Sequence, residues 1–364
     1  MIRAASEQEI GQWDNLVAQN SDGGHIYNTF EWNEFKKTAS WQPHYLVYEQ
    51  AGFVLYFCLA EKTASFLGTI YYCSKGPGMF KDYKASELSI AQFKDFCTEL
   101  KRYVYTIDKK AILVKLDPEL LEGEYNLREV GLRKSSADLQ FKATIFVDLT
   151  PSEEEILASF KQKTRYNVRL AQRKGVVIER RDMTEENIEL MFELMSATQA
   201  RAGFFLRKKN YFALYWKILA DAGLGQLLVA THEGEVLSGI FATKFGSKGY
   251  YKDGGSFSIK RNLMAPYLLQ WAAMQWAKEQ GVTSYDLVAA PPKADLEDPD
   301  HPYAGLYQFK RGFHDNITEF VGCYDLPISD NKYKIWQRQE RAFLKLYKKM
   351  TKNLFKARQN GCKD

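Results

Sequence analysis

The sequence predicts an α/β protein built from two compact units. Its 364 residues, 45% of them hydrophobic, exceed the roughly 250–300 residues that a single hydrophobic core usually serves. Helical and strand-like patterns alternate along the chain, and the two halves share a similar order of elements. We therefore expect two α/β units, each with its own core.

The first half alternates helices and strands. In chain order, the patterns predict a helix around Trp13, an aromatic-rich helix at 31–36, strands at 45–48 and 53–57, a helix near 86–108 and a strand at 111–116. Pro118 ends that last strand, leaving Asp117 at its carboxyl end.

A helix start marks the boundary between the units. A strand at 144–149 is followed by Thr150, Pro151 and Ser152 and then by acidic residues, a pattern typical of a helix N-terminus. We place the units at 1–148 and 149–316. The second half then predicts a helix to about 174, a strand at 176–178, helices at 184–200 and 209–221, strands at 226–230, 236–242 and 248–253, a helix at 266–280 and a strand at 284–287.

The positive charge is concentrated at the C-terminus. Residues 330–364 hold 11 basic and 3 acidic side chains, whereas residues 1–329 have a net charge of −3. Apolar residues recur at helical spacing in this segment, which predicts a basic amphipathic helix at 331–360. They are Trp336, Phe343, Tyr347, Met350 and Leu354. Such a helix packs on the protein body, or it contacts RNA or an anionic membrane face.

Composition also indicates the compartment. The five cysteines are scattered and form no CxxC pair, which argues against a disulfide framework and a structural zinc site. No apolar run approaches the about 20 residues of a membrane-spanning helix. We expect a cytoplasmic protein, with peripheral contact at the inner membrane face as an option.

Common catalytic and cofactor motifs are missing. The sequence has no P-loop, no GxGxxG after a strand, no HExxH and no GxSxG, so it predicts no metal and no bound nucleotide cofactor. Residues 172–177 read QRKGVV, superficially like an acetyl-coenzyme A loop, but they close a helix instead of opening one. Cys58 and Cys73 lie in or beside strand-like apolar stretches, which favours buried, unreactive thiols.

Two basic segments remain as candidate sites. The helix after residue 160 carries cations with no acid between Phe160 and Gly175, which indicates either a solvated surface or a contact for phosphates or RNA. They include Lys161, Lys163, Arg165 and Arg169. Further along, Lys310 and Arg311 stand between aromatic residues.

Seven short blocks in register resemble the Fem family of non-ribosomal peptidyl transferases, most closely its FemX-like members. The blocks are EWNEFK at 31–36, SKGP at 74–77, KLDP at 115–118, KTRYNVR at 163–169, RAG at 201–203 with Arg207 and YF at 211–212, YDL at 285–287, and LYQFKRGF at 306–313. This family uses aminoacyl-tRNA to add amino acids to the stem peptide of peptidoglycan precursors.

The resemblance implies a fold and a set of partners. It implies two GCN5-related N-acetyltransferase-like domains, the first completed by a strand at 317–328 that returns to it. It also implies aminoacyl-tRNA as co-substrate, no cofactor, and a precursor that is either UDP-linked or lipid-linked. The transferred amino acid, its position in the bridge and the oligomeric state stay open.

The resemblance also assigns roles to residues. Lys36 and Arg207 would hold the precursor's diphosphate, which suits an ammonium and a guanidinium. Lys310 would be the catalytic cation near the aminoacyl ester. The remaining substrate-binding residues would be Tyr211, Asp117, Tyr251 and Phe309, and the basic helix of residues 161–169 would contact tRNA.

Two other functions are compatible with the sequence. A coenzyme A-dependent N-acyltransferase would share the fold, and a non-catalytic protein that binds tRNA or a membrane would share the basic segments. Transfer from an aminoacyl ester needs positioning and oxyanion stabilisation but no covalent intermediate, which agrees with the lack of a convincing nucleophile.

Overall fold

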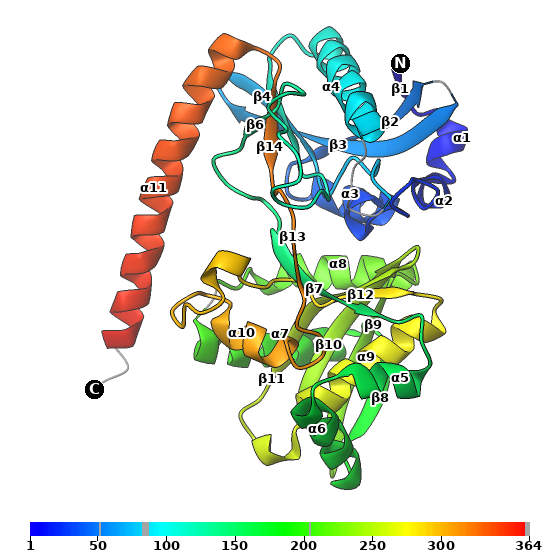
Figure 1. The fold of residues 1–364 in the computed structure, drawn as a ribbon. Coiled ribbons are helices and arrows are strands. Elements are labelled where there is room, and N and C mark those ends of the chain that lie inside the picture. The colour runs from blue at the N-terminus through cyan, green and yellow to red at the C-terminus, as the bar shows by residue number, and fades with distance from the viewer. Residues whose placement is uncertain (51, 82–86, 204, 361–364) are drawn as a thin grey trace.

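The chain folds into two α/β domains, one above the other in Figure 1, with a long C-terminal helix beside them. The computed structural model describes residues 1–50, 52–81, 87–203 and 205–360, and for residues 65, 87, 88 and 347–360 the backbone alone. The α/β class and the pair of units are confirmed. Among the described residues, no helix combines the length and the apolar character that crossing a membrane requires.

The first domain is a seven-stranded mixed sheet in the order β1-β2-β3-β4-β5-β14-β6. Its strands are β1 (Ile2–Ala4), β2 (Gln42–Gln50), β3 (Phe53–Ser65), β4 (Gly68–Cys73), β5 (Ala111–Leu116), β6 (Arg133–Lys134) and β14 (Tyr324–Pro327). Its helices are α1 (Glu7–Ile10), α2 (Trp13–Val17), α3 (Phe30–Lys37) and α4 (Glu87–Ile107). Residues of α4 and one face of the sheet form its core, which includes Phe57, Phe93, Phe96 and Val114.

The second domain is a seven-stranded sheet in the order β13-β7-β12-β11-β10-β9-β8. Its strands are β7 (Ala143–Asp148), β8 (Val177–Arg181), β9 (Gly225–His232), β10 (Glu235–Phe245), β11 (Lys248–Ser256), β12 (Ser284–Asp286) and β13 (Ile317–Glu319). Its helices are α5 (Glu153–Ser159), α6 (Gln162–Arg173), α7 (Glu185–Ala202), α8 (Lys209–Asp221), α9 (Ala265–Glu279) and α10 (Ala304–Lys310).

The structure corrects the boundary between the units. Strand β7, predicted to end the first unit, pairs with β12 and β13 in the second sheet. Of the predicted returning strand at 317–328, only β14 joins the first sheet, through β5 and β6. Gly322, at φ 70°, separates β13 from β14. The residues of a strand show that it is buried, but they do not show which sheet it joins.

The predicted helix up to residue 174 is interrupted. Ser152 caps α5 in a capping box with Glu155. At Phe160 the backbone becomes extended, and its ring packs edge-on against Trp271 and Phe313 in the core. The helix therefore breaks where an aromatic side chain enters the core, and α6 starts after it.

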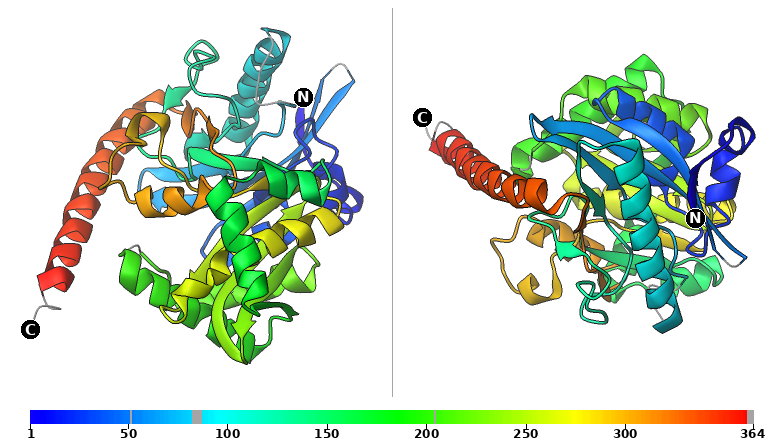
Figure 2. Two further views of the ribbon diagram at one scale, coloured as in Figure 1. Left: turned by 60° about the horizontal axis from the view of Figure 1, so that its bottom comes forward. Right: turned by 90° about the horizontal axis from the view of Figure 1, so that it is seen from above.

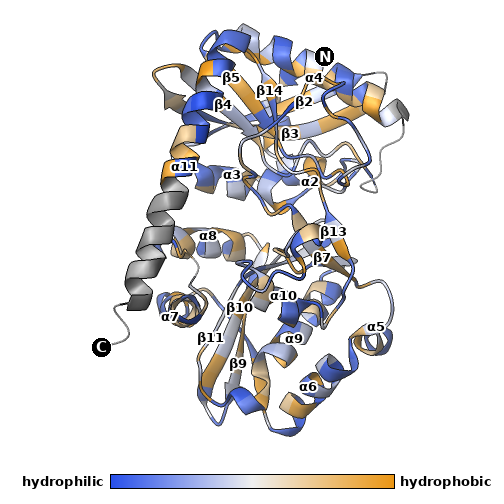
Figure 3. Cartoon of the chain, turned by 60° about the vertical axis from the view of Figure 1, so that its left-hand side comes forward, coloured by the Kyte–Doolittle hydropathy of each residue, from blue (hydrophilic) through white to orange (hydrophobic). Residues whose placement is uncertain are grey.

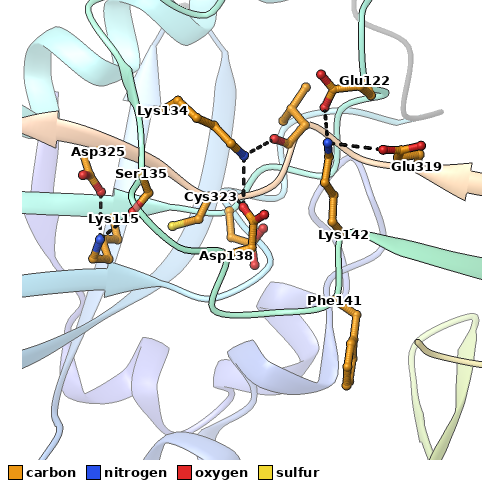
Figure 4. Close-up of polar contacts among 12 residues, drawn as sticks. Lys115, Glu122, Lys134, Ser135, Asp138, Phe141, Lys142, Glu319, Cys323 and Asp325 are labelled. Atoms are coloured by element: carbon orange, nitrogen blue, oxygen red, sulfur yellow. Dashed lines mark hydrogen bonds and ion pairs between the residues drawn. The ribbon is translucent and has the colours of Figure 1, made fainter. Parts of the chain in front are cut away.

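The chain crosses between the domains twice, and polar contacts tie the two crossings together (Figure 4). Lys134 donates to the carbonyl of Val321 over 2.6 Å and pairs with Asp138. Lys142 contacts Glu122 and Glu319 at 2.9 and 3.2 Å. These bonds fix the connecting segments that border the space between the domains.

A hydrophobic cluster joins the two domains. Trp13, Trp32 and Phe35 of the first domain pack in one cluster with Tyr215 and Trp216 of α8 and with residues of α7 and β10. Lys248 of β11 adds ion pairs to Asp22 and Glu119 of the first domain at 3.5 and 3.3 Å. The interface is therefore part of the folded core, and it positions the side chains around it.

The C-terminal helix is α11 (Asp330–Asn360), as predicted, and it extends from the first domain alongside the second (Figures 1 and 2). Tyr333 is buried and Trp336 packs beside it against Ile112 and Leu113 of β5. Phe343, also assigned to the apolar stripe, is 64% exposed. The side chains of Tyr347, Met350 and Leu354 lie outside the described residues.

Candidate active site at the domain interface

A cleft opens between the two domains. It is lined by Tyr27 and Lys75 from the first domain, by Gln140 and Phe141 from the connecting segment, and by Lys252 and Asp286 from the second domain. Lys75 donates to the carbonyl of Phe141 over 3.2 Å and lies 4.9 Å from the ring centroid of Phe320. Basic and acidic side chains thus line this cleft, and both domains contribute to it.

Lys36 and Arg207, the predicted diphosphate pair, are brought near each other. Lys36 is on α3, which Thr29 caps by accepting from the Trp32 amide, and Arg207 precedes α8. The two helices meet where Phe35 packs edge-on against Tyr211, 5.0 Å between centroids. Burial, with the nearby Arg207, lowers the pKa of Lys36 to about 8. Within the described part of the chain, neither cation forms an ion pair with a carboxylate.

Tyr211, which the resemblance assigns to substrate binding, lies beside Arg207. The Arg207 guanidinium lies 4.6 Å from the centroid of its ring, a cation–π contact. Burial raises the pKa of the Tyr211 phenol, so it stays a neutral donor. Arg207 itself is exposed, which leaves the guanidinium open to a ligand.

Lys252, which sequence reasoning did not select, belongs to this cluster. Its Nζ lies 5.4, 5.3 and 5.3 Å from the ring centroids of Tyr27, Trp32 and Tyr215. Burial and then the charges of Lys36 and Arg207 lower its pKa to about 8. The sequence carries no signal for it, because the aromatic rings around it come from both domains.

Lys310, the predicted catalytic residue, is 2% exposed at the end of α10. Its Nζ donates to the carbonyls of Val288 and Ala289, two residues at φ 53°. Burial lowers its pKa to about 7, while Asp286 opposes the shift. The predicted Tyr251 lies beside it, with its ring centroid 5.3 Å from Nζ. Val288 and Ala289 both line the interdomain cleft, so Lys310 is held at its wall.

Phe309 turns toward a different cleft. Together with Tyr267, Arg201 and Arg261 it lines a hollow of about 560 Å³ in the second domain. Phe309 packs against Tyr267 at 5.0 Å and against Phe313 at 5.3 Å. Phe309 therefore lines the cleft within the second domain, whereas the adjacent Lys310 bonds to two carbonyls in the wall of the interdomain cleft.

Two carboxyl groups lie near the interface cleft. Asp117, a predicted site residue, is 2% exposed and accepts from the Tyr72 hydroxyl over 3.3 Å. Burial raises its pKa, and Lys75 opposes this. Asp286, quoted only as part of a motif, accepts from Thr144 and from the Val288 amide. Asp286 thereby supports the turn whose carbonyls bind Lys310.

The cations of α6 have mixed environments. Val168 and Ala171 are buried in the second-domain core, and Figure 3 shows hydrophilic residues alternating with hydrophobic ones along the helix. Lys161 pairs with Asp315 at 3.0 Å, and Arg165 donates to the carbonyls of Ala158 and Phe160. Lys163 and Arg169 are exposed. The helix starts near Lys310, because the Lys161 amide donates to the carbonyl of Gly312.

The described residues do not favour a cysteine nucleophile or a metal site. Cys58, Cys73, Cys97 and Cys323 are buried free thiols, and burial raises the pKa of each. Cys362 lies outside the described residues. Among the side chains that the structure describes, no group of three or more His, Cys, Asp and Glu is arranged to hold a metal ion.

Comparison with known proteins agrees with this geometry. The FemAB family matches residues 7–141, 131–231 and 225–341. A lipid II:glycine glycyltransferase of Staphylococcus epidermidis is 22% identical over 418 residues, covering 93% of this chain and 97% of that protein. The corresponding protein of Staphylococcus aureus is 23% identical over 421 residues, covering 94% and 97%.

Solved structures show the same fold. A crystal structure of FemX has a TM-score of 0.78 at 22% identity, covering 93% of this chain and 100% of that one. The structure of L-PGS from Bacillus licheniformis has a TM-score of 0.50 at 13% identity, covering 92% and 97%. Together with the glycyltransferase relatives, this shared fold identifies the class of protein as an aminoacyltransferase. The chain belongs to the FemAB family, as the sequence blocks indicated.

Proposed function

We propose that this enzyme transfers an amino acid from aminoacyl-tRNA to the stem peptide of a peptidoglycan precursor, forming an interpeptide bridge. The observation that carries the proposal is the cation cluster at the interface. Lys36 and Arg207, from different domains, converge without a carboxylate partner among the described residues. A cluster of this kind suits the diphosphate of a UDP-linked or lipid-linked precursor.

The reaction needs no covalent intermediate. The acceptor amine attacks the ester carbonyl of the aminoacyl group, a C–N bond forms, and the ribose oxygen leaves with a proton. The amine loses its proton to substrate groups or water. The Lys310 ammonium, fixed by two carbonyls, stabilises the tetrahedral oxyanion or the 3′ end of the tRNA. Asp117 and Tyr251 would contribute to binding the acceptor, and the reaction would need no cofactor.

The donor would occupy the cleft inside the second domain. Burial and then the charge of the nearby Arg261 lower the pKa of Arg201, and two guanidinium groups close together suit phosphate groups. Phe309 and Tyr267 offer rings on which a base can stack. The exposed Lys163 and Arg169 of α6 would extend this contact along the tRNA.

The precursor and tRNA place the reaction in the cytoplasm. The basic residues of α11 would add a contact to tRNA, or a peripheral contact to the anionic inner membrane face when the precursor is lipid-linked. Removing residues 347–364 distinguishes these contacts. A raised KM for tRNA supports the first, lost binding to vesicles with anionic lipid supports the second, and no change in either excludes both.

A transfer assay tests the proposal. Purified protein is given radiolabelled glycyl-, alanyl- and seryl-tRNA with UDP-MurNAc-pentapeptide or lipid II in separate reactions, and acetyl-coenzyme A replaces tRNA in a parallel arm. We expect label in one acceptor, abolished by ribonuclease and strongly reduced in Lys310→Met. Acyl transfer from acetyl-coenzyme A alone would overturn the proposal, as would binding of tRNA with no transfer to either precursor.

A further inference from the structure

The ammonium group of Lys252 lies among aromatic rings at the domain interface, a position that packing of the fold does not require. This ammonium group is surrounded by three aromatic rings, from Tyr27 and Trp32 in the first domain and Tyr215 in the second. The ring of Trp32 also lies 5.9 Å from Nζ of Lys36. Two ammonium groups thus lie near one indole, and their like charges repel.

No carboxylate compensates this charge within the described part of the chain. The neighbouring Asp253 points to α8, where Tyr215 and Trp216 donate to its carboxyl group. Burial raises the pKa of Asp253 to about 8, so at neutral pH it brings little negative charge to the cluster. Cation–π contacts recover only part of the cost of bringing three cations together.

A local irregularity of β11 directs Lys252 into the cleft. In the pairing of β10 with β11, Phe241 faces Asp253 and Ala242 faces Tyr251, so Lys252 is the extra residue of a β-bulge. Tyr251 consequently packs toward Lys310 and Asp253 toward α8, while Lys252 lines the interdomain cleft. Bulges re-aim side chains in this way, and such positions are frequent next to active sites.

We propose that Lys252 is a third ligand of the precursor's diphosphate, acting with Lys36 and Arg207. The inference rests on the proposed function, because that function supplies the anion. Lys36 of the first domain and Lys252 of the second lie 5.9 and 5.3 Å from the ring centroid of Trp32, and a dianion bound by both would replace repulsion by charge-assisted hydrogen bonds. Lys252 is then a binding residue for the acceptor and makes no contact with the donor.

The test measures acceptor binding separately from transfer. Dissociation constants for UDP-MurNAc-pentapeptide are determined by calorimetry for the wild type, Lys252→Met and Lys252→Arg, with Lys244→Met of the neighbouring strand as a matched control. We expect at least a tenfold weaker complex for Lys252→Met, a smaller loss for Lys252→Arg and none for Lys244→Met. Inorganic pyrophosphate should compete with the precursor in the wild type and poorly in Lys252→Met, while KM for tRNA stays unchanged.

Each outcome decides one question. If the wild type and Lys252→Met bind the precursor equally well, this inference is wrong and the proposed function is unaffected. Wild-type protein that binds neither UDP-MurNAc-pentapeptide nor lipid II overturns the proposed acceptor itself. If Lys252→Met unfolds at a lower temperature, Lys252→Gln, which is one atom shorter and uncharged but retains an N–H donor, provides the same comparison. Normal precursor affinity in that variant overturns the inference.

Discussion

At the scale of single residues, the site is distinguished by cations whose charge the protein leaves uncompensated. Lys36 and Lys252 have pKa values lowered to about 8, and Lys310 to about 7. Ordinary surface lysines titrate near 10.4. Strongly perturbed groups that converge on a cleft are typical of functional sites. Bringing these like charges together destabilises the folded protein. A bound anion relieves this repulsion, and the relief strengthens anion binding.

Replacing Lys310 by Met should lower kcat of amino acid transfer by about 10²–10³-fold, the usual effect of removing one oxyanion-stabilising group. Met fills a similar volume but leaves the carbonyls of Val288 and Ala289 without their donor. Single-turnover transfer measures the effect. Lys293→Met, which changes an exposed lysine of the neighbouring loop, is the matched control. Similar rates in both variants would rule out a catalytic role.

Affinity for the precursor should fall as pH rises. Lys36 and Lys252 are charged below their pKa values of about 8 and neutral above them, whereas a diphosphate diester stays doubly charged. The dissociation constant should therefore be lowest near pH 7 and rise between about pH 8 and 10. Calorimetry with UDP-MurNAc-pentapeptide measures it. In Lys36→Met the rise should be shallower, and a flat profile in the wild type would contradict the assignment.

At the scale of elements, strand β11 contributes to both parts of the site, the surroundings of Lys310 and the cation cluster. Its bulge separates Tyr251, beside Lys310, from Lys252 in the cation cluster. Close packing on α7 holds the strand in place, because a Cβ on Gly255 would lie 2.3 Å from the backbone carbon of Leu194. The absence of a side chain at this position is what allows the helix and strand to approach.

Gly255→Ala should therefore lower the free energy of unfolding by about 1–3 kcal/mol, since neither backbone can yield without repacking. Urea denaturation measures the change. Gly305→Ala is the control, because a Cβ on Gly305 meets nothing within 4 Å and Ala favours the helix at that position. Equal stability of both variants would mean that α7 and β11 can separate at little cost.

At the scale of the whole molecule, α11 is anchored to the first domain by buried charges. Lys115 of β5 pairs with Asp325 of β14 at 3.0 Å and with Glu340 of α11 at 3.1 Å. The Tyr333 hydroxyl donates to Asp325 over 3.1 Å. The first turns of the helix thus complete the core and the ion network, and the family match ends at residue 341.

Truncations should separate these two parts of α11. Deleting residues 347–364 should leave the thermal unfolding temperature within a few degrees of the wild type. Deleting residues 331–364 should lower it strongly, because Lys115 would lose one carboxylate and the apolar face of β5 would be uncovered. Differential scanning calorimetry measures both. Equal stability of the two truncated proteins would show that the helix adds nothing to the core.

Much of the fold could be predicted from local pattern. The strand at 111–116 and the helix at 209–221 have the predicted bounds, because their apolar periodicity and breakers are local properties. The sheet to which β7 belongs, the break at Phe160 and the bulge at Lys252 could not be predicted in this way. Each depends on which side chains meet from distant parts of the chain.

The sequence by itself determined the α/β class, the family and the identity of Lys36, Arg207, Tyr211 and Lys310 as candidates, because these depend on residue types and short motifs. Only the tertiary structure decided that Lys36 and Arg207 converge, that Lys252 joins them, and that Phe309 lines one cleft while Lys310 bonds to the wall of another. The reason is that charge repulsion, burial and aromatic contact act between atoms close in space, and folding brings together residues that are far apart in the sequence.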